Sequence, residues 1–315
     1  MTTSSRWLPA VGLLVLAAIL LAFPFAASGY QIYIINLVMV WVVMSLGLNI
    51  LMGETGLFGM AHVAFYGIGI YTTGLLTNNT GVPVLLAIFL AGCLAALIGF
   101  ILGVLSIRMN DIYLGLSTFA FGEAMQWVFH NWDAVTKGVN GLRISPTTFF
   151  GWRIDSDFRA YFVALGIAVA FTVGAVVLSR SRFGRAMRAV RESEPAAAAV
   201  GINIRRVKVS AFAISAFYAG CAGGLITIFT SYIHPDTLGF NTTIVILTML
   251  VVGGMGTIPG AIIGAAAIGV LSEFLRQAAD RQEMIYGFVL VLFMVFLPDG
   301  IYGRVRQFWR RWSTR

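Results

Sequence analysis

The sequence predicts an all-α, polytopic membrane protein, and three observations support this fold class. Apolar residues make up 59% of the 315 residues, charged residues make up only 11%, and the mean hydropathy is +0.88. A soluble domain would carry roughly 25% charged residues. Several apolar runs approach or exceed the ~20 residues that a membrane-spanning helix needs. We therefore expect residues 1–315 to form one transmembrane domain of about ten helices, some short or broken.

The expected spans alternate with shorter polar connections. In chain order they cover residues 7–27, 31–51, 57–76, 82–107, 112–130, 160–178, 209–232, 241–252, 258–275 and 284–301. Glycine-containing breaks precede the third and the ninth span, at residues 53–56 and 253–257. The first run has an alternative interpretation as a cleaved signal peptide, because Arg6 precedes it and small residues end it. We favour an uncleaved span, because many more spans follow.

Two longer polar connections interrupt this pattern. Residues 131–158 contain glycines and a proline, whereas residues 179–208, the basic segment, hold eight basic side chains and two acids. Burying those eight cations in lipid would cost on the order of 20 kcal/mol, so the basic segment lies in water. With ten spans, it shares one side with both termini, and that side collects 15 of the 21 basic residues. The positive-inside rule then makes this side cytoplasmic and residues 131–158 extracytoplasmic.

The sequence lacks the motifs of common enzyme classes. Its only lysines are Lys137 and Lys208, so no Gly-Lys-Ser/Thr phosphate-binding loop is possible. It has no His-Glu-x-x-His or Cys-x-x-Cys pair for a metal ion and no Gly-x-Ser-x-Gly nucleophile elbow. The basic residues lie between and after apolar runs, as orientation signals do, which argues against nucleic-acid binding. Any ATP-driven transport therefore needs an ATPase on another chain.

The basic segment is expected to contain two short cytoplasmic helices. The first covers residues 183–191, with Arg185 and Arg188 on one face. Ser193 can cap a second helix, and Gly201 can end it. A loop that only orients the protein needs a few cations and no capped helices. This pattern therefore favours docking to a soluble partner protein.

Polar residues and glycines in or near the spans are candidates for a transport pathway. An ionisable residue inside a membrane span is costly to bury, so it is a candidate for a functional role. Interrupted spans at matching positions in the two halves of a chain indicate a transport pathway in a duplicated fold. An equally supported alternative is that small residues let helices approach closely. Glu54 and Glu273 lie near span ends, where we expect their carboxylates to be solvated. For His62 we favour a hydrogen bond between helices. The candidate pathway residues are Asn49, Gly56, His62, Thr118, Glu123, Gly253 and Gly254.

Several stretches together resemble one family. They are LNILMGETGL and AHVAFYGIGIY (48–57 and 61–71), SRFGRAMRAVRESE (181–194), GGMGT (253–257) and PDGI (298–301). This combination resembles the LivM-like permease subunits of ABC importers for branched-chain amino acids. The sequence departs from the family's usual Thr-Gly-Gly-x-x-Gly-Leu with TKGVNGL at 136–142, which bears on the substrate or on docking of a binding protein. It also lacks the Glu-Ala-Ala…Gly spacing of many ABC importers.

The resemblance implies a function and a set of partners. The chain would carry leucine, isoleucine or valine across a bacterial inner membrane, with urea, amides or other amino acids as alternative substrates. Its partners would be a second, related permease, two cytoplasmic ATPases and an extracytoplasmic solute-binding protein. ATP and Mg²⁺ would be used by the ATPases, and this chain would bind no cofactor. The residues expected to couple ATP hydrolysis to transport are Phe183, Gly184, Arg185, Arg188, Arg191, Glu192, Glu194, Ala197 and Gly201.

An ion-coupled carrier or channel is the rival interpretation. In that case the basic segment would be a solvated orientation loop. A proton-coupled carrier would need several buried carboxylates, and Glu123 is the one convincing candidate in the sequence. This rival is therefore less favoured.

Overall fold

Helices make up nearly all of the described structure. The computed structural model describes residues 18–107, 109, 111–145, 148–149, 152–153, 156–275, 279–297 and 300–313. Each of the expected spans corresponds to a helix, which confirms the all-α fold. Residues 18–26 are helical, and the helices at the other nine expected spans are α2 (Gly29–Leu48), α3 (His62–Thr80), α4 (Val84–Ser106), α5 (Asp111–Asn131), α7 (Asp157–Arg180), α10 (Ile204–Ile226), α11 (Phe240–Gly253), α12 (Ile258–Leu275) and α13 (Ala279–Phe296). The start of the first span lies outside the described residues.

The helices differ in how well they suit a bilayer. Among the described residues, five stretches are long and apolar enough to cross a membrane by themselves: Gly29–Glu54, Val84–Ser106, Asp157–Arg180, Ile204–Ile226 and Ile258–Leu275. By contrast, α11 has only 14 residues. The fold therefore combines full-length spans with shorter helices, as the sequence predicts.

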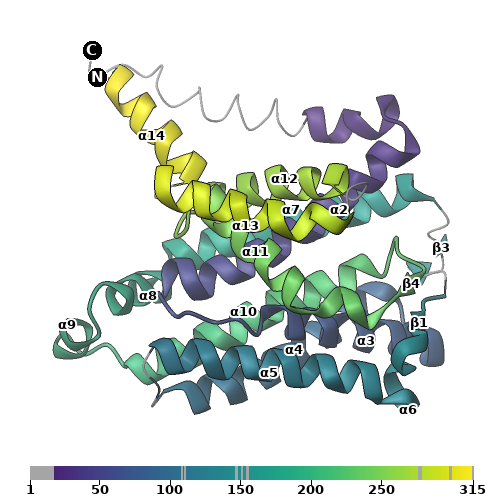
Figure 1. Ribbon diagram of the computed structural model, residues 1–315, viewed down its shortest axis with the longest axis horizontal. Coiled ribbons are helices and arrows are strands. Elements are labelled where there is room, and N and C mark those ends of the chain that lie inside the picture. Colours follow the sequence, from purple (N-terminus) through teal and green to yellow (C-terminus); the bar gives the residue numbers. More distant parts are fainter. Residues whose placement is uncertain are drawn as a thin grey trace.

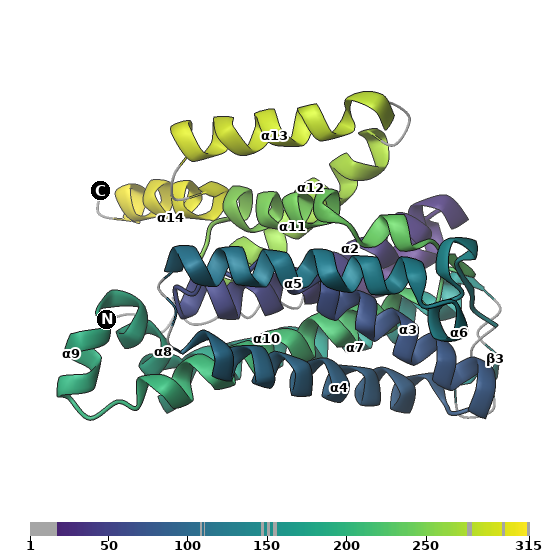
Figure 2. The ribbon, with the colours of Figure 1, turned by 60° about the horizontal axis from the view of Figure 1, so that its bottom comes forward.

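The helix α10 lies at the centre of the bundle. It packs against α2, α3 and α4, whereas α12 packs against α2 and α11 (Figures 1 and 2). A methyl group added at Gly69 would overlap the Gly220 carbonyl, and one at Gly223 would overlap the Tyr66 carbonyl. Close packing between α3 and α10 therefore requires glycine at these two positions.

The first chain break differs from the prediction. The helix α2 continues into a π-helix, η2 (Asn49–Glu54), and residues 56–61 then form a non-helical segment. The third span was expected from residue 57, but α3 begins at His62. Gly56 explains the difference, because its φ of 78° lies in the left-handed region and directs the chain out of the helix.

The connection between α5 and α7 contains short elements at one end of the bundle. They are α6 (Asp133–Thr136), η3 (Gly138–Asn140), β1 (Leu142–Arg143), β2 (Thr148–Phe149) and β3 (Trp152–Arg153). The strand β1 pairs with β4 (Tyr232–Ile233), and β2 pairs with β3. The short helix η4 (Pro235–Leu238) follows β4 and leads into α11. Figure 2 shows α6 and β3 at the end of the molecule opposite α8 and α9.

The basic segment forms the predicted pair of helices, α8 (Arg182–Glu192) and α9 (Glu194–Ala199). The Ser193 hydroxyl accepts a hydrogen bond from the Ala196 N–H, and Gly201 has a φ of 84°, so both predicted ends of α9 are confirmed. The last three cations of the segment were expected before the next span, but they lie within the first turns of α10. Asn203 caps α10 by accepting from the Arg206 N–H.

The last span also differs from the prediction. It was expected to run to residue 301, but α13 ends at Phe296 and α14 (Gly300–Ser313) follows as a separate helix. Gly300 has a φ of 68° and packs against the backbone of Gly254. The second chain break is therefore in contact with the start of α14.

Candidate functional site

The two chain breaks, which are about 200 residues apart, meet near α8. The Asn49 side-chain oxygen accepts a hydrogen bond from the Gly256 N–H at 2.8 Å. A methyl group at Gly53 would lie 2.5 Å from the Gly256 nitrogen, so a larger residue there would separate the breaks. Gly254 ends α11 with a φ of 116°. The structure thus joins the two breaks through the candidate residue Asn49 and through Gly53 and Gly256, which the sequence did not single out for the pathway.

Two arginines of α8 bind the first break. Arg188 Nη1 lies 3.3 Å from Glu54 Oε2 and donates to both the carbonyl and the hydroxyl of Ser179, each at 3.0 Å. Arg191 Nη1 donates to the Gly53 carbonyl, and its aliphatic stem packs over Gly56. A methyl group at Gly256 would lie 2.5 Å from Arg191 Nη1. Arg191 therefore contacts both breaks at once.

The expectation that Glu54 is solvated is wrong. Its side chain is 3% exposed and pairs with Arg188, because the break folds back under α8. Glu273 is likewise buried, and its Oε1 accepts a hydrogen bond from the Tyr30 hydroxyl. Position at a span end does not predict exposure when another segment of the chain covers that end.

Replacing Glu54 by Gln is expected to lower the thermal unfolding midpoint of the purified transporter by several degrees. The substitution removes the anionic partner of Arg188 in a buried position, which costs about 1–3 kcal/mol. The double variant Glu54→Gln with Arg188→Gln should be less destabilised than the sum of the two single variants, because the two residues interact directly. Additive losses would contradict this pairing.

The remaining residues expected to couple ATP hydrolysis to transport divide into buried and exposed positions. Gly184 and Ala197 are buried, and a methyl group at Gly184 would overlap the end of α7. Glu194 pairs with the buried Lys208 at 2.6 Å, so it holds α9 against α10. Arg185 is exposed. Of the other residues expected to couple ATP hydrolysis to transport, Phe183 is half-buried, and Glu192 and Gly201 are exposed.

The exposed face of α8 and α9 is available to another protein. Arg182 and Arg185 lie on it, as do the small residues Ala198 and Ala199. Val200 follows them with 76% of its surface exposed. Ala196 is also exposed, whereas Ala197 faces inward.

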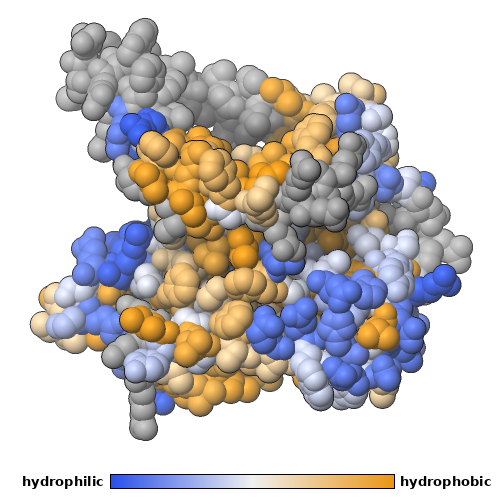
Figure 3. Space-filling view, viewed as in Figure 1, coloured by the Kyte–Doolittle hydropathy of each residue, from blue (hydrophilic) through white to orange (hydrophobic). Residues whose placement is uncertain are grey.

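An apolar groove runs along α5 and α11. One part, about 580 Å³, is lined by the apolar side chains of the 56–61 segment, α5 and α11. A second part, about 410 Å³, continues to Gly56, Arg191 and Met255. Figure 3 shows a hollow bordered by hydrophobic residues on this face. The two parts share Phe58, so the groove reaches from α5 to the chain breaks.

Thr118 and His62 have different roles. The Thr118 hydroxyl accepts a hydrogen bond from the Met60 N–H at 3.0 Å, so it holds the 56–61 segment against α5. His62 is buried, with Nε2 2.9 Å from the Met44 carbonyl oxygen and Nδ1 3.3 Å from the Ser215 hydroxyl. His62 therefore joins α3 to α2 and α10, which is the favoured interpretation, and it lies outside the residues that line the groove.

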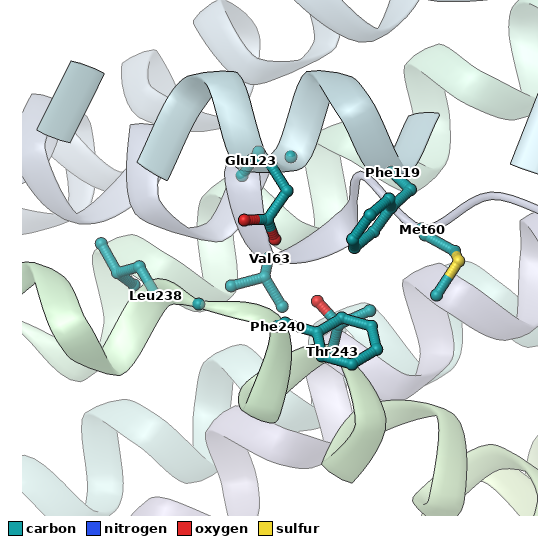
Figure 4. A pocket seen from close by; sticks show the side chains of 10 residues that line it. Met60, Val63, Phe119, Glu123, Leu238, Phe240 and Thr243 are labelled. Carbon is teal, nitrogen blue, oxygen red and sulfur yellow. The ribbon is translucent and has the colours of Figure 1, made fainter. Parts of the chain in front are cut away.

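Glu123 points into a small cavity beside the groove. The cavity, about 10 Å³, lies between α5, α3 and α11, and Figure 4 shows the Glu123 carboxylate directed toward Val63 and Thr243. Met60, Phe119 and Phe240 line both this cavity and the groove. Of the candidate pathway residues, Glu123 and Gly56 are the ones that line these spaces directly.

Comparison with known proteins identifies the family. The family described as "Branched-chain amino acid transport system / permease component" matches residues 30–297. The chain belongs to this family. This branched-chain permease is 32% identical to the high-affinity branched-chain amino acid transport system permease protein LivM of Escherichia coli (strain K12), over 94% of this chain and 75% of the relative. The resemblance read from the sequence motifs is confirmed.

The permease is also similar to relatives with other names. LivH of Salmonella typhimurium (strain LT2) is 28% identical over 84% of this chain and 91% of its own length. BraD of Pseudomonas aeruginosa is 32% identical over 55% of this chain and 57% of its own length. No solved structure matches this permease significantly. The family match covers α2 to α13 and both chain breaks, whereas α14 lies beyond it.

Proposed function

We propose that this chain is the permease subunit of an ABC importer for leucine, isoleucine and valine. The observation that carries the proposal is the family match over residues 30–297, because the matched relatives are named as branched-chain amino acid permeases. The apolar lining of the groove supports it, since aliphatic side chains fit such a surface. The chain is one transmembrane permease domain of the bacterial inner membrane.

The groove is open along one side, and a second, related permease covers it in the proposed transporter. The similarity of this chain to both LivM and LivH supports a pair of homologous permeases. An extracytoplasmic solute-binding protein docks at the end that holds β1, β4 and residues 131–158. Both termini and the basic segment lie in the cytoplasm.

The two ATPases bind ATP and Mg²⁺ and dock on the exposed face of α8 and α9, and this chain binds no cofactor. Movement of α8 is transmitted through Arg188 and Arg191 to the first break, and from there to Gly256. The breaks continue into the 56–61 segment and α11, which line the groove. ATP hydrolysis in the partner subunits therefore changes the shape of the groove.

The complete transporter, with both permeases, both ATPases and the binding protein, is expected to take up leucine in proteoliposomes in an ATP-dependent manner. The measurement is accumulation of radiolabelled leucine, isoleucine and valine, with urea and acetamide as comparison solutes. Omission of the ATPases should abolish uptake. Leucine uptake by this chain alone without ATP would identify a carrier or channel, and uptake of urea alone would change the substrate class.

A further inference from the structure

Glu123 is a carboxylate without a cationic partner in the described part of the chain. None of the ion pairs among described residues involves it. It lies on α5 about two turns before this helix ends at Asn131, within the length expected to cross the membrane. A charge at this depth is costly without a counter-charge. The Glu123 side chain is exposed on the surface of the described chain, so a counter-charge on another molecule can reach it.

The surroundings of Glu123 indicate which molecule supplies that charge. The cavity into which it points holds about one water molecule, and it adjoins the apolar groove of about 580 Å³. Besides the residues that also line the cavity, the groove is lined by Ile112, Leu116 and Phe58. A carboxylate thus lies beside a space that accepts an apolar side chain. A small molecule with a cationic group and an aliphatic group fits both.

We propose that Glu123 binds the α-ammonium group of the transported amino acid while the aliphatic side chain lies in the groove. A carboxylate and an ammonium form charge-assisted hydrogen bonds, which are stronger than neutral ones. The rings of Phe119 and Phe240, 5.3 Å apart and nearly perpendicular, border the same cavity and offer further attraction to a cation. Urea and amides lack the positive charge, so Glu123 favours amino acids over them.

This binding position is connected to the coupling machinery. Met60, which lines the cavity, belongs to the segment that follows the first break, and α11 runs from Phe240 at the cavity to Gly253 at the second break. Movement of both breaks therefore displaces two walls of the cavity. Release of the ammonium group from Glu123 follows from that displacement. The inference rests on the proposed function and adds the group that recognises the substrate.

The test compares Glu123→Gln, Glu123→Asp and Asp280→Asn in the complete reconstituted transporter. Asp280 belongs to the first turn of α13, outside the residues that line the groove, and serves as the control for loss of one negative charge. Two quantities are measured: leucine uptake, and the ATP hydrolysis that leucine-loaded binding protein stimulates. We expect Glu123→Gln to reduce uptake at least tenfold while stimulated ATP hydrolysis stays within twofold of wild type. Glu123→Asp should retain several times more uptake than Glu123→Gln.

Three results would overturn the proposal. Wild-type uptake by Glu123→Gln would exclude recognition by charge. Equal uptake by Glu123→Asp and Glu123→Gln would show that uptake does not depend on a carboxylate at this position. A parallel loss of uptake and stimulated ATP hydrolysis in an assembled complex would assign Glu123 to coupling. Failure of the wild-type complex to import any amino acid would instead refute the proposed function itself, so the two failures are distinguishable.

Discussion

Replacing Arg191 by Met is expected to reduce ATP-driven uptake at least about fivefold in a transporter that still assembles. Methionine keeps an unbranched stem over Gly56 but donates no hydrogen bond to the Gly53 carbonyl. Loss of a charged donor to a part-buried acceptor costs about 1–3 kcal/mol, which corresponds to a factor of about 5 to 150 in an equilibrium between two conformations. The measurement is leucine uptake per ATP hydrolysed in proteoliposomes.

The controls for Arg191 separate its geometry from its charge. Arg191→Lys keeps the charge but lacks the planar guanidinium, so it should recover only part of the uptake. Arg306→Met removes an exposed arginine of α14 outside the break cluster and should leave uptake unchanged. If Arg191→Met imports leucine at the wild-type ratio to ATP hydrolysis, the contact between α8 and the breaks plays no part in coupling.

Replacing Gly264 by Ala is expected to destabilise the permease more than any other substitution considered. A methyl group there would overlap the Met249 carbonyl and lie 2.8 Å from the Gly253 nitrogen, both backbone atoms of α11 that cannot rotate away. Forcing these helices apart costs about 1–3 kcal/mol or more. The measurements are the yield of folded, monodisperse protein and its thermal unfolding midpoint.

Gly166→Ala is the matched control for this effect. Gly166 lies within α7, and nothing in the described structure lies within 4 Å of the position of an added methyl group. Alanine favours a helix over glycine by about 1 kcal/mol, so this variant should unfold at the same temperature as wild type or slightly higher. If Gly264→Ala behaves like Gly166→Ala, α11 and α12 do not pack through this glycine in the folded permease.

Local signals predicted the helices of this protein well, and long-range contacts explain what they missed. The apolar runs identify the spans because hydropathy is a property of a single segment, and Ser193 and Gly201 mark α9 because capping is local. Residues 57–61 include several apolar residues and were therefore assigned to a helix. Their non-helical path depends on Gly56 and on the hydrogen bond from the Met60 N–H to Thr118, which lies on another helix.

The long-range contacts of the candidate site could not be predicted from local sequence signals either. Its residues were recognisable as polar groups and glycines in unusual places, but their partners were not. The contacts of Arg188 with Glu54 and of Arg191 with Gly53 join positions more than 130 residues apart. One signal was available: a carboxylate beside a chain break needs a cation, and the basic segment is the richest source of them.

The length of α11 has a consequence for the energy barrier that a solute meets. Its 14 residues extend about 21 Å, whereas the hydrocarbon core of a bilayer is about 30 Å thick. At least one end of α11 therefore lies below the lipid headgroups, where backbone groups outside a helix need protein or water around them. Its N-cap residue is Gly239, which has no side chain that could accept a hydrogen bond from the first N–H groups. Water that surrounds this end of α11 would shorten the distance over which a zwitterion must travel without bulk water.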